Sequence, residues 1–383
     1  MRFSFTDEQL MLRDSVEGFL SEHSDSPAVR AAMASNSGID ERLWEKICTD
    51  MYWQAILVPE EFGGLGLGLL EVVIVLEQMG RFLTPAPLAA GTQSALALRT
   101  VVDQPLAKTM LDDLARGQLV AFAHTAARPH WDGQGVEIVA TEVPSGWTLQ
   151  GEARFIASGN SADALLVVAQ IDNKLGLFRV AANQAGVAFS RMPTMDQTRP
   201  MGLLQLSGVA VNDEDCLATD WGQHLEAVLD LSRIMVGAEQ VGCAQASLDQ
   251  SVSYVSERVQ FGRTIASYQA IKHKAADMML KVESARSLLY YAACVGDETL
   301  KATAPSADLR EAAAMLASSA GDAAFFCAGT GIQLHGGVGI TEEYDIQLYF
   351  KRARSMEAYL GRPDEQREVL AAMLLDGDDC HAA

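Results

Sequence analysis

The sequence lacks several features that would narrow its function at once. None of its six cysteines forms a Cys-x-x-Cys pair, so zinc sites and dithiol redox motifs have little support. Widely scattered cysteines are typical of reduced thiols in a cytoplasmic protein. The N-terminus has no basic flank followed by an apolar run, so it does not predict a signal peptide. No apolar run is long and uninterrupted enough to predict a membrane span.

Basic residues are also scarce. The 383 residues include 29 lysines and arginines against 50 acidic residues, which gives a formal net charge of -21. Such a surface repels phosphate backbones and anionic lipids, which argues against nucleic acids and membranes as main partners. A phosphate-bearing ligand therefore needs a local basic site. With 49% hydrophobic residues, the chain can form two or three domains with cores of their own.

The pattern of the sequence predicts an α+β multidomain protein. Thr6 and Gln9 form a plausible capping box, apolar residues at helical spacing follow, and residues 70–79 predict a buried helix. In the middle region, short β-forming runs separated by turn residues predict short strands. Long helices follow, which favours a four-helix bundle. We expect an N-terminal all-α domain, a middle β-barrel or sandwich domain and a C-terminal bundle, at 1–118, 119–220 and 221–383. The expected strands are 136–141, 146–151, 164–169 and 174–180, and the expected bundle helices are 225–258, 266–296, 307–332 and 365–375.

Three segments carry the most specific patterns. The segment 257–279 reads Glu-Arg-Val-Gln-Phe-Gly-Arg-Thr-Ile-Ala-Ser-Tyr-Gln-Ala-Ile-Lys-His-Lys-Ala-Ala-Asp-Met, and the segment 331–344 reads Gly-Ile-Gln-Leu-His-Gly-Gly-Val-Gly-Ile-Thr-Glu-Glu-Tyr. The third, 352–361, reads Arg-Ala-Arg-Ser-Met-Glu-Ala-Tyr-Leu-Gly. The plain interpretation of the first two is a joint between helices and a helix C-cap with a structural His335. The residues offer no metal-ligand spacing, so we expect no metal.

Together these segments resemble the acyl-CoA dehydrogenase family, and the resemblance spans nearly the whole chain. It implies an FAD-dependent oxidoreductase that removes the α-proton of an acyl-CoA thioester while a hydride passes to the flavin. Arg258 would clamp the FAD pyrophosphate of a neighbouring subunit, since a guanidinium binds phosphate oxygens in a fixed fork. Arg233 matches a family arginine near the substrate. The cofactor-binding residues that the resemblance implies are Arg258, Gln260, Phe261, Gln269, Gln333, Leu334, Gly336, Gly337 and Thr125.

The chain departs from the family where the base should stand. Leu360 occupies the position of the glutamate that usually removes the α-proton, and leucine cannot accept a proton. Some members take the base from the long helix, where this chain has Ser232, which is not a base without an activator. Glu239 and Glu357 are weak substitutes. We therefore expect no catalytic base in this chain.

Other departures affect the contacts that a family subunit makes to its own flavin. The family segment Thr-Glu-Pro-Gly-Ala-Gly-Ser-Asp is here Thr125-Ala-Ala-Arg-Pro-His-Trp-Asp132, which retains only its two ends. A family tryptophan and threonine beside the flavin become Phe155 and Ala157. After Gly361, a threonine and a glutamine become Arg362 and Asp364, and an aspartate beside a pyrophosphate is repulsive.

The losses concern the chain's own flavin, whereas the contacts to a neighbour's flavin are intact. We therefore expect a subunit that completes the FAD site of a second acyl-CoA dehydrogenase chain, similar to the α2β2 enzymes of steroid side-chain breakdown. Acyl-CoA would be the substrate and electron-transfer flavoprotein the electron acceptor. The alternatives are a homomeric dehydrogenase, such as a homotetramer, with a different base, a flavin-dependent monooxygenase of the same fold, and a non-enzymatic acyl-CoA-binding protein. The acyl chain cannot be predicted.

Overall fold

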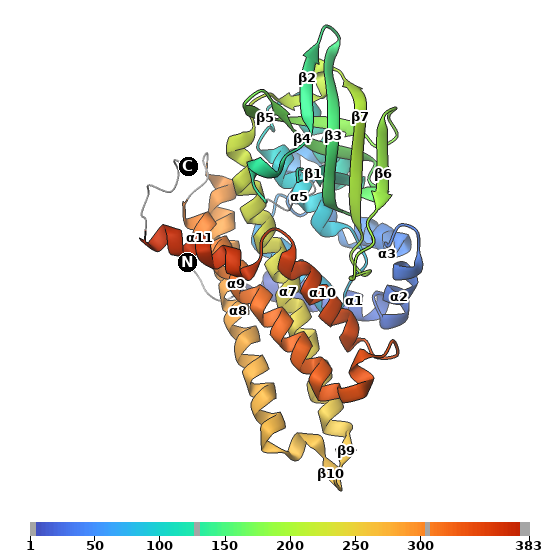
Figure 1. Cartoon of the computed structure of the whole chain (residues 1–383), viewed down its shortest axis with the longest axis vertical. Coiled ribbons are helices and arrows are strands. Elements are labelled where there is room, and N and C mark those ends of the chain that lie inside the picture. Colours follow the sequence, from blue (N-terminus) through green and yellow to red (C-terminus); the bar gives the residue numbers. More distant parts are fainter. Residues whose placement is uncertain (1–4, 126–130, 303–306, 376–383) are drawn as a thin grey trace. The chain divides into compact units, whose positions relative to one another are not determined.

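A computed structural model describes residues 5–125, 131–302 and 307–375. The chain forms two compact units. The first consists of the chain up to Arg30, of Leu69–Thr84 and of the chain from Arg233 onward, and the second of Ala31–Gly68 and Pro85–Ser232. One long helix, α7 (Gly222–Glu257), contributes residues to both units, and Figure 1 draws it in yellow.

The first unit is built from helices. Those it contains besides most of α7 are α1 (Asp7–His23), α4 (Leu69–Arg81), α8 (Gln269–Lys301), α9 (Ala307–His335), α10 (Ile346–Ala358) and α11 (Pro363–Leu375). The expected capping box is confirmed, because Thr6 caps α1 and exchanges hydrogen bonds with Gln9. The helices expected at 225–258, 266–296, 307–332 and 365–375 are confirmed, with ends shifted by a few residues. α10 was not expected.

Two glycines let α4 and α7 pack backbone to backbone. A Cβ at Gly242 would lie 1.9 Å from the carbonyl oxygen of Glu77, and one at Gly80 would lie 2.2 Å from that of Glu239. Real carbon–oxygen contacts are never so short, so only glycine fits at either position. The N-terminus of α4 is held by α8, since the Asp297 carboxylate accepts the Leu69 N–H.

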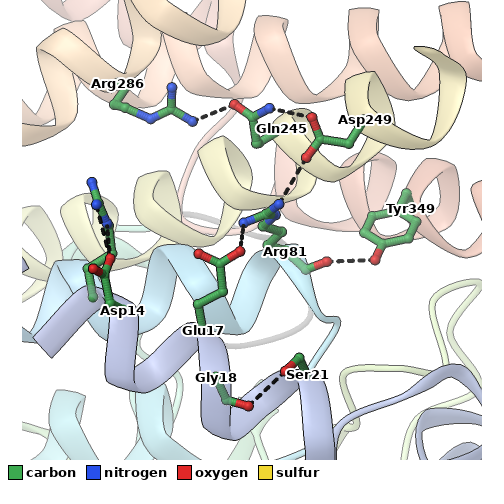
Figure 2. A network of polar contacts seen from close by, with 10 residues as sticks. Asp14, Glu17, Gly18, Ser21, Arg81, Gln245, Asp249, Arg286 and Tyr349 are labelled. Carbon is green, nitrogen blue, oxygen red and sulfur yellow. Dashed lines mark hydrogen bonds and ion pairs between the residues drawn. The ribbon is translucent and has the colours of Figure 1, made fainter. Parts of the chain in front are cut away.

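Charged side chains tie the helices of this unit together (Figure 2). Arg81 on α4 pairs with Glu17 on α1 at 2.7 Å and with Asp249 on α7 at 3.2 Å. Its carbonyl oxygen accepts a 2.6 Å hydrogen bond from the Tyr349 hydroxyl on α10. The buried Glu77 accepts hydrogen bonds from Arg286 Nε at 2.9 Å and from the Tyr290 hydroxyl at 2.6 Å. These contacts fix α10 and α8 against α4.

The second unit contains a mixed sheet and short helices. The eight strands that the structure describes in this sheet have the order β6-β7-β3-β2-β4-β5-β8, with β1 parallel to β4. Seventeen buried residues, among them Trp147 and Phe178, form its core. The strands are β1 (Val120–Ala123), β2 (Val139–Val143), β3 (Gly146–Ala157), β4 (Ala164–Ile171), β5 (Lys174–Ala181), β6 (Val187–Arg191), β7 (Met201–Val211) and β8 (Cys216–Ala218). The helices are α2 (Ser26–Ala34), which begins in the first unit, α3 (Glu41–Lys46), α5 (Leu88–Arg99) and α6 (Pro105–Ala115).

The strand-rich middle region is thus confirmed, and its strands form one sheet. Four of the strands were expected, whereas β1, β6, β7 and β8 were not. Within the described residues, one segment, Asp308–Ile340, is long and apolar enough to cross a membrane by length and composition, but 61% of its most apolar window is buried inside the protein. That burial is typical of a core helix.

Candidate functional site

The loop between α10 and α11 carries Leu360, at the position where the family resemblance places the catalytic glutamate. Leu360 has a φ of 63°, in the left-handed region that leucine rarely adopts, and its side chain is 1% exposed. Its carbonyl oxygen accepts a 2.8 Å hydrogen bond from Nε of the buried Arg233. Gly361 has a φ of 111°, and a Cβ there would lie 2.4 Å from Nε2 of Gln366. The loop keeps a defined backbone although its side chain cannot move a proton.

The two carboxylates considered as substitutes are both beside arginines. Glu239 is buried on α7, and its Oε2 lies 4.0 Å from Nη1 of Arg352. Glu357 forms an ion pair with Arg354 one turn earlier on α10. Neither arrangement supports a replacement for the missing glutamate.

Ser232, at the alternative base position, lies in the second unit and is engaged in hydrogen bonds. Its hydroxyl donates to the Val228 carbonyl at 2.6 Å and accepts from Nε2 of Gln93 on α5 at 3.1 Å. Both side chains are buried. Gln93 was not expected from the sequence, although an amide in a helix of alanine and leucine is a signal of a buried polar partner. Neither partner of the hydroxyl is a base, so this pair does not activate the serine.

A short hairpin between α7 and α8 presents the first family segment. Its strands are β9 (Val259–Gln260) and β10 (Arg263–Thr264), and its tip is Phe261-Gly262, with φ values of 54° and 80°. The Phe261 side chain is 92% exposed. Arg258, Gln260 and Gln269 are exposed as well. Figure 1 shows the hairpin at the end of the long helices of this unit. An exposed aromatic ring on a strained tip indicates contact with another molecule.

The second family segment lies at the end of α9, and its Gln333, Gly336 and Gly337 are exposed. A Cβ at Gly336 or Gly337 would meet no described atom within 4 Å, so their backbone is open to a ligand. Leu334 is 7% exposed and packs into the same apolar cluster as Tyr254 and Ile265, which flank the hairpin. The structure thus anchors both segments in one cluster.

His335 has the structural role that its plain interpretation predicts. Nδ1 lies 2.7 Å from the Gly331 carbonyl, and the ring stacks on Tyr254 with centroids 4.3 Å apart. Burial lowers the pKa of His335, which keeps the imidazole neutral. A neutral ring with Nδ1–H donating to a carbonyl fixes the start of the glycine turn.

The segment 125–132, which resembles the family's flavin-ring element, follows β1 in the second unit. Thr125 is buried, and its carbonyl oxygen accepts the Arg154 N–H at 2.7 Å. Residues 126–130 of this segment lie outside the described residues. Phe155 has a φ of 57° in an irregular stretch of β3, and Ala157 is buried. The ring of Trp131 lies against that of Phe155, with centroids 5.9 Å apart.

Arg362 and Asp364, which replace polar residues of the family, form a two-pronged ion pair. Nε and Nη2 of Arg362 donate to the two carboxylate oxygens at 3.0 and 3.1 Å. The hydrogen bond from Arg362 lowers the pKa of Asp364. The ion pair offsets the negative charge of Asp364. It also occupies the guanidinium of Arg362, which would otherwise be free to bind a phosphate.

Comparison with known proteins decides the family. The model of the acyl-CoA dehydrogenase N-terminal domain matches residues 6–118, and that of the C-terminal domain matches residues 221–375. The acyl-CoA dehydrogenase IpdE2 of Mycobacterium tuberculosis is 35% identical, over 95% of this chain and 95% of its own. The chain belongs to the acyl-CoA dehydrogenase family. Members of this family are FAD-dependent oxidoreductases that act on CH–CH bonds.

Solved structures of two-chain complexes are also similar to this chain. The ChsE4-ChsE5 complex from Mycobacterium tuberculosis has a TM-score of 0.87 and 26% identity, over 98% of this chain and 99% of that one. A variant of the Tcur3481-Tcur3483 steroid ACAD has a TM-score of 0.85 and 27% identity, over 97% and 98% of the two chains.

The residues fit FAD on one side only. The exposed Arg258, the exposed ring of Phe261 and the open backbone at Gly336 and Gly337 fit a flavin nucleotide that approaches the hairpin end of the bundle. The elements that would hold this chain's own flavin do not fit. The side chain of Ala157 has no donor, Trp131 places an indole where the family resemblance implies a serine, and Arg362 is bound to Asp364.

Proposed function

We propose that this chain is the non-catalytic subunit of a two-chain acyl-CoA dehydrogenase and completes the FAD site of its catalytic partner. The observation that carries the proposal is the contrast between two loops. The Leu360 loop keeps its backbone but has no base. The hairpin keeps its arginine and phenylalanine and exposes both.

The missing base matters because the α-proton of a thioester is weakly acidic. Loss of a general base typically lowers the rate about 10²–10⁴-fold. FAD, when bound, accepts the hydride from the β-carbon. The residues of this chain bind and position groups but move no proton. Arg233, which matches the family arginine near the substrate, holds the Leu360 carbonyl, and the exposed hairpin is available to the partner.

The residues that would hold the partner's FAD come from the two segments that share one apolar cluster. Arg258 binds the pyrophosphate, Phe261 packs against the flavin, and the glycine turn admits the adenosine end. Leu334 contributes its backbone, because its side chain is buried. Gln260, Gln269 and Gln333 are exposed and offer amide donors. Thr125, by contrast, would contact this chain's own flavin and not that of the partner.

The arrangement that we propose is an α2β2 assembly acting on a steroid-type acyl-CoA in the cytoplasm, with electron-transfer flavoprotein as acceptor. The similarity to the ChsE4-ChsE5 complex and to the Tcur3481-Tcur3483 steroid ACAD supports it. We propose three domains, at residues 1–118, 119–220 and 221–383. The matches at residues 6–118 and 221–375 are compatible with these boundaries.

The test is co-expression with a dehydrogenase that retains the glutamate and is encoded beside this chain. We expect the lone chain to be nearly colourless in the flavin absorption band and the pair to bind flavin and oxidise acyl-CoA. In the pair, Arg258→Ala should lower both flavin occupancy and activity at least about tenfold, since a charge-assisted contact to phosphate is lost. The matched control is Arg263→Ala on the same hairpin, whose guanidinium lies over the Tyr268 ring at 4.0 Å.

Full flavin occupancy and rapid acyl-CoA oxidation by the lone chain would overturn the proposal. Oxygen consumption driven by NADH or reduced flavin would instead identify a monooxygenase. An Arg258→Ala pair with unchanged flavin content would show that the hairpin serves no neighbouring FAD.

A further inference from the structure

Four aromatic rings follow one another across the second unit, from β1 to β3. Phe122 on β1 stacks on His124 with centroids 5.2 Å apart. The His124 ring lies 5.9 Å from that of Trp131, and Trp131 lies 5.9 Å from Phe155 on β3. Trp131 is only 8% exposed although it lies in a connection between strands. An indole so well covered is a packed part of the domain.

The backbone of β3 is distorted where it meets Trp131. The pairing with β7 shifts register between Ala153 and Ile156, and Phe155 within that shift has a φ of 57°. The left-handed conformation is unfavourable for a residue with a Cβ, because that atom crowds the backbone. A bulge of this kind re-aims a side chain, and the ring of Phe155 meets that of Trp131. The strained backbone at Phe155 is thus accompanied by an aromatic contact between Phe155 and Trp131.

The positions of these rings relate the contact to the flavin site that the family resemblance implies. Phe155 and Ala157 stand where the family resemblance places residues beside the flavin ring, and Trp131 stands where it places a serine. An indole buries roughly 150–250 Å², far more than a hydroxymethyl group. Ala157, 7% exposed, adds an apolar wall and no hydrogen-bond donor.

We propose that Trp131 is an internal substitute for the flavin ring, and that its indole fills this chain's own isoalloxazine position. The inference rests on the proposed function and deepens it. The chain does not merely lack contacts to its own flavin; it has closed that half of the site with a side chain. Removal of the indole opens a flat apolar slot, beside Phe155, for a tricyclic aromatic ring.

The experiment uses lumiflavin, the ring system without phosphates, titrated into the full-length chain, alone and in the co-purified pair. The wild-type chain should neither quench lumiflavin fluorescence nor rise in Tm with it. Trp131→Ser should quench lumiflavin fluorescence and rise in Tm. Its Kd should be at least about tenfold lower than the lower limit that the wild-type titration sets. Trp147→Ala is the matched control. Trp147 is equally buried, at 8% exposed, but packs against Phe178 in the sheet core, with centroids 5.5 Å apart.

Phe155→Ala opens the same slot from the other side and serves if Trp131→Ser does not fold. Lumiflavin binding by wild type, or by none of the variants at positions 131 and 155, overturns the proposal, as does one FAD per chain in the wild-type pair. Equal binding by Trp147→Ala does so too. The titration of the lone chain does not depend on the partner, so it can succeed even if Arg258 proves to serve no neighbouring site.

Discussion

At the scale of single residues, the backbone of the Leu360 loop is fixed independently of the side chain at position 360. Arg233 binds the carbonyl oxygen of Leu360, and Gly361 packs against Gln366, so the loop is fixed through its backbone. In the proposed function, the side chain at position 360 then decides whether the loop supplies a base. The same holds at Ser232, whose hydroxyl is committed to Val228 and Gln93.

The buried Tyr349 and the partly buried Tyr290 should make the stability of the protein sensitive to alkali. Burial raises the pKa of Tyr349, and burial together with the Glu77 carboxylate raises that of Tyr290. In the unfolded chain a tyrosine titrates near about pH 10. Their contribution to stability is therefore complete below about pH 10 and is lost as the pH rises further.

Tyr349→Phe tests this directly. At about pH 8 the variant should lose about 1 kcal/mol, because the hydrogen bond to the Arg81 carbonyl is gone. Its free energy of unfolding, measured with urea from about pH 8 to about pH 11, should then fall less steeply than that of the wild type. Tyr52→Phe, which changes a half-exposed ring, is the control. Parallel curves for Tyr349→Phe and wild type would refute the assignment.

At the scale of elements, the hairpin between α7 and α8 is strained at its tip and exposes an aromatic ring. Phe261 is held in the left-handed region, and with 92% of its side chain exposed it gains nothing from burial. Asparagine adopts this conformation more readily than phenylalanine.

Phe261→Asn should therefore raise the free energy of unfolding of the lone chain by up to about 1 kcal/mol, since strain is relieved and no packing is lost. The same substitution should lower the activity of the two-chain enzyme. Gly262→Ala is the paired control and should destabilise, because Gly262 has a φ of 80° in open space. Denaturant unfolding and turnover of the pair measure the two effects. A destabilised Phe261→Asn chain would count against strain at this tip.

Elements with a complete local signal were predictable from the sequence. The capping box at Thr6 and the apolar run of α4 predicted two helices correctly. α10 was not predicted, although its buried Ile346, Tyr349, Ala353 and Met356 recur at helical spacing, because its C-terminal half overlaps the segment 352–361 that resembles a family motif. β7 was missed because glycines interrupt it. A Cβ at Gly202 would lie 2.0 Å from the Phe189 ring on β6, so that glycine serves packing between strands rather than a turn.

The candidate site shows the same limit. The exposed residues of the hairpin and of the glycine turn could be named from spacing, because each segment is continuous in sequence. The partnership of Gln93 with Ser232 joins residues 139 positions apart, and no local pattern encodes it. In the sequence, Trp131 is only a departure from the family segment 125–132. Its contact with Phe155 could not be predicted, because the fold of the sheet brings the two rings together.

At the scale of the whole molecule, the compact units do not follow the sequence matches. The match to the C-terminal domain begins at residue 221, but the helical unit also includes α1 and α4. α4 supplies the Glu77 carboxylate to Arg286 and Tyr290, and α8 supplies Asp297 to the start of α4.

A fragment of residues 221–383 should therefore fail to fold cooperatively. Without α4, the partly buried guanidinium of Arg286 and the hydroxyl of Tyr290 both lose the Glu77 carboxylate that joins them to the rest of the unit. The apolar face of α7 around Gly242 would also be exposed. We expect a broad thermal transition and a weak near-ultraviolet circular dichroism signal, against a sharp transition for the full chain. A sharp, cooperative melt of the fragment would contradict the role assigned to α4.

The hydrogen bond from Arg233 to Leu360 has an evolutionary consequence. Because the arginine binds a main-chain atom, a change of side chain at this position leaves the loop in place. In the proposed two-chain assembly, a duplicated dehydrogenase gene that loses the carboxylate at this position by point mutation still encodes a folded chain, which is retained as the partner of the other copy. In that proposal, the backbone of the loop is retained from a catalytic subunit, and the leucine marks the subunit that no longer supplies the base.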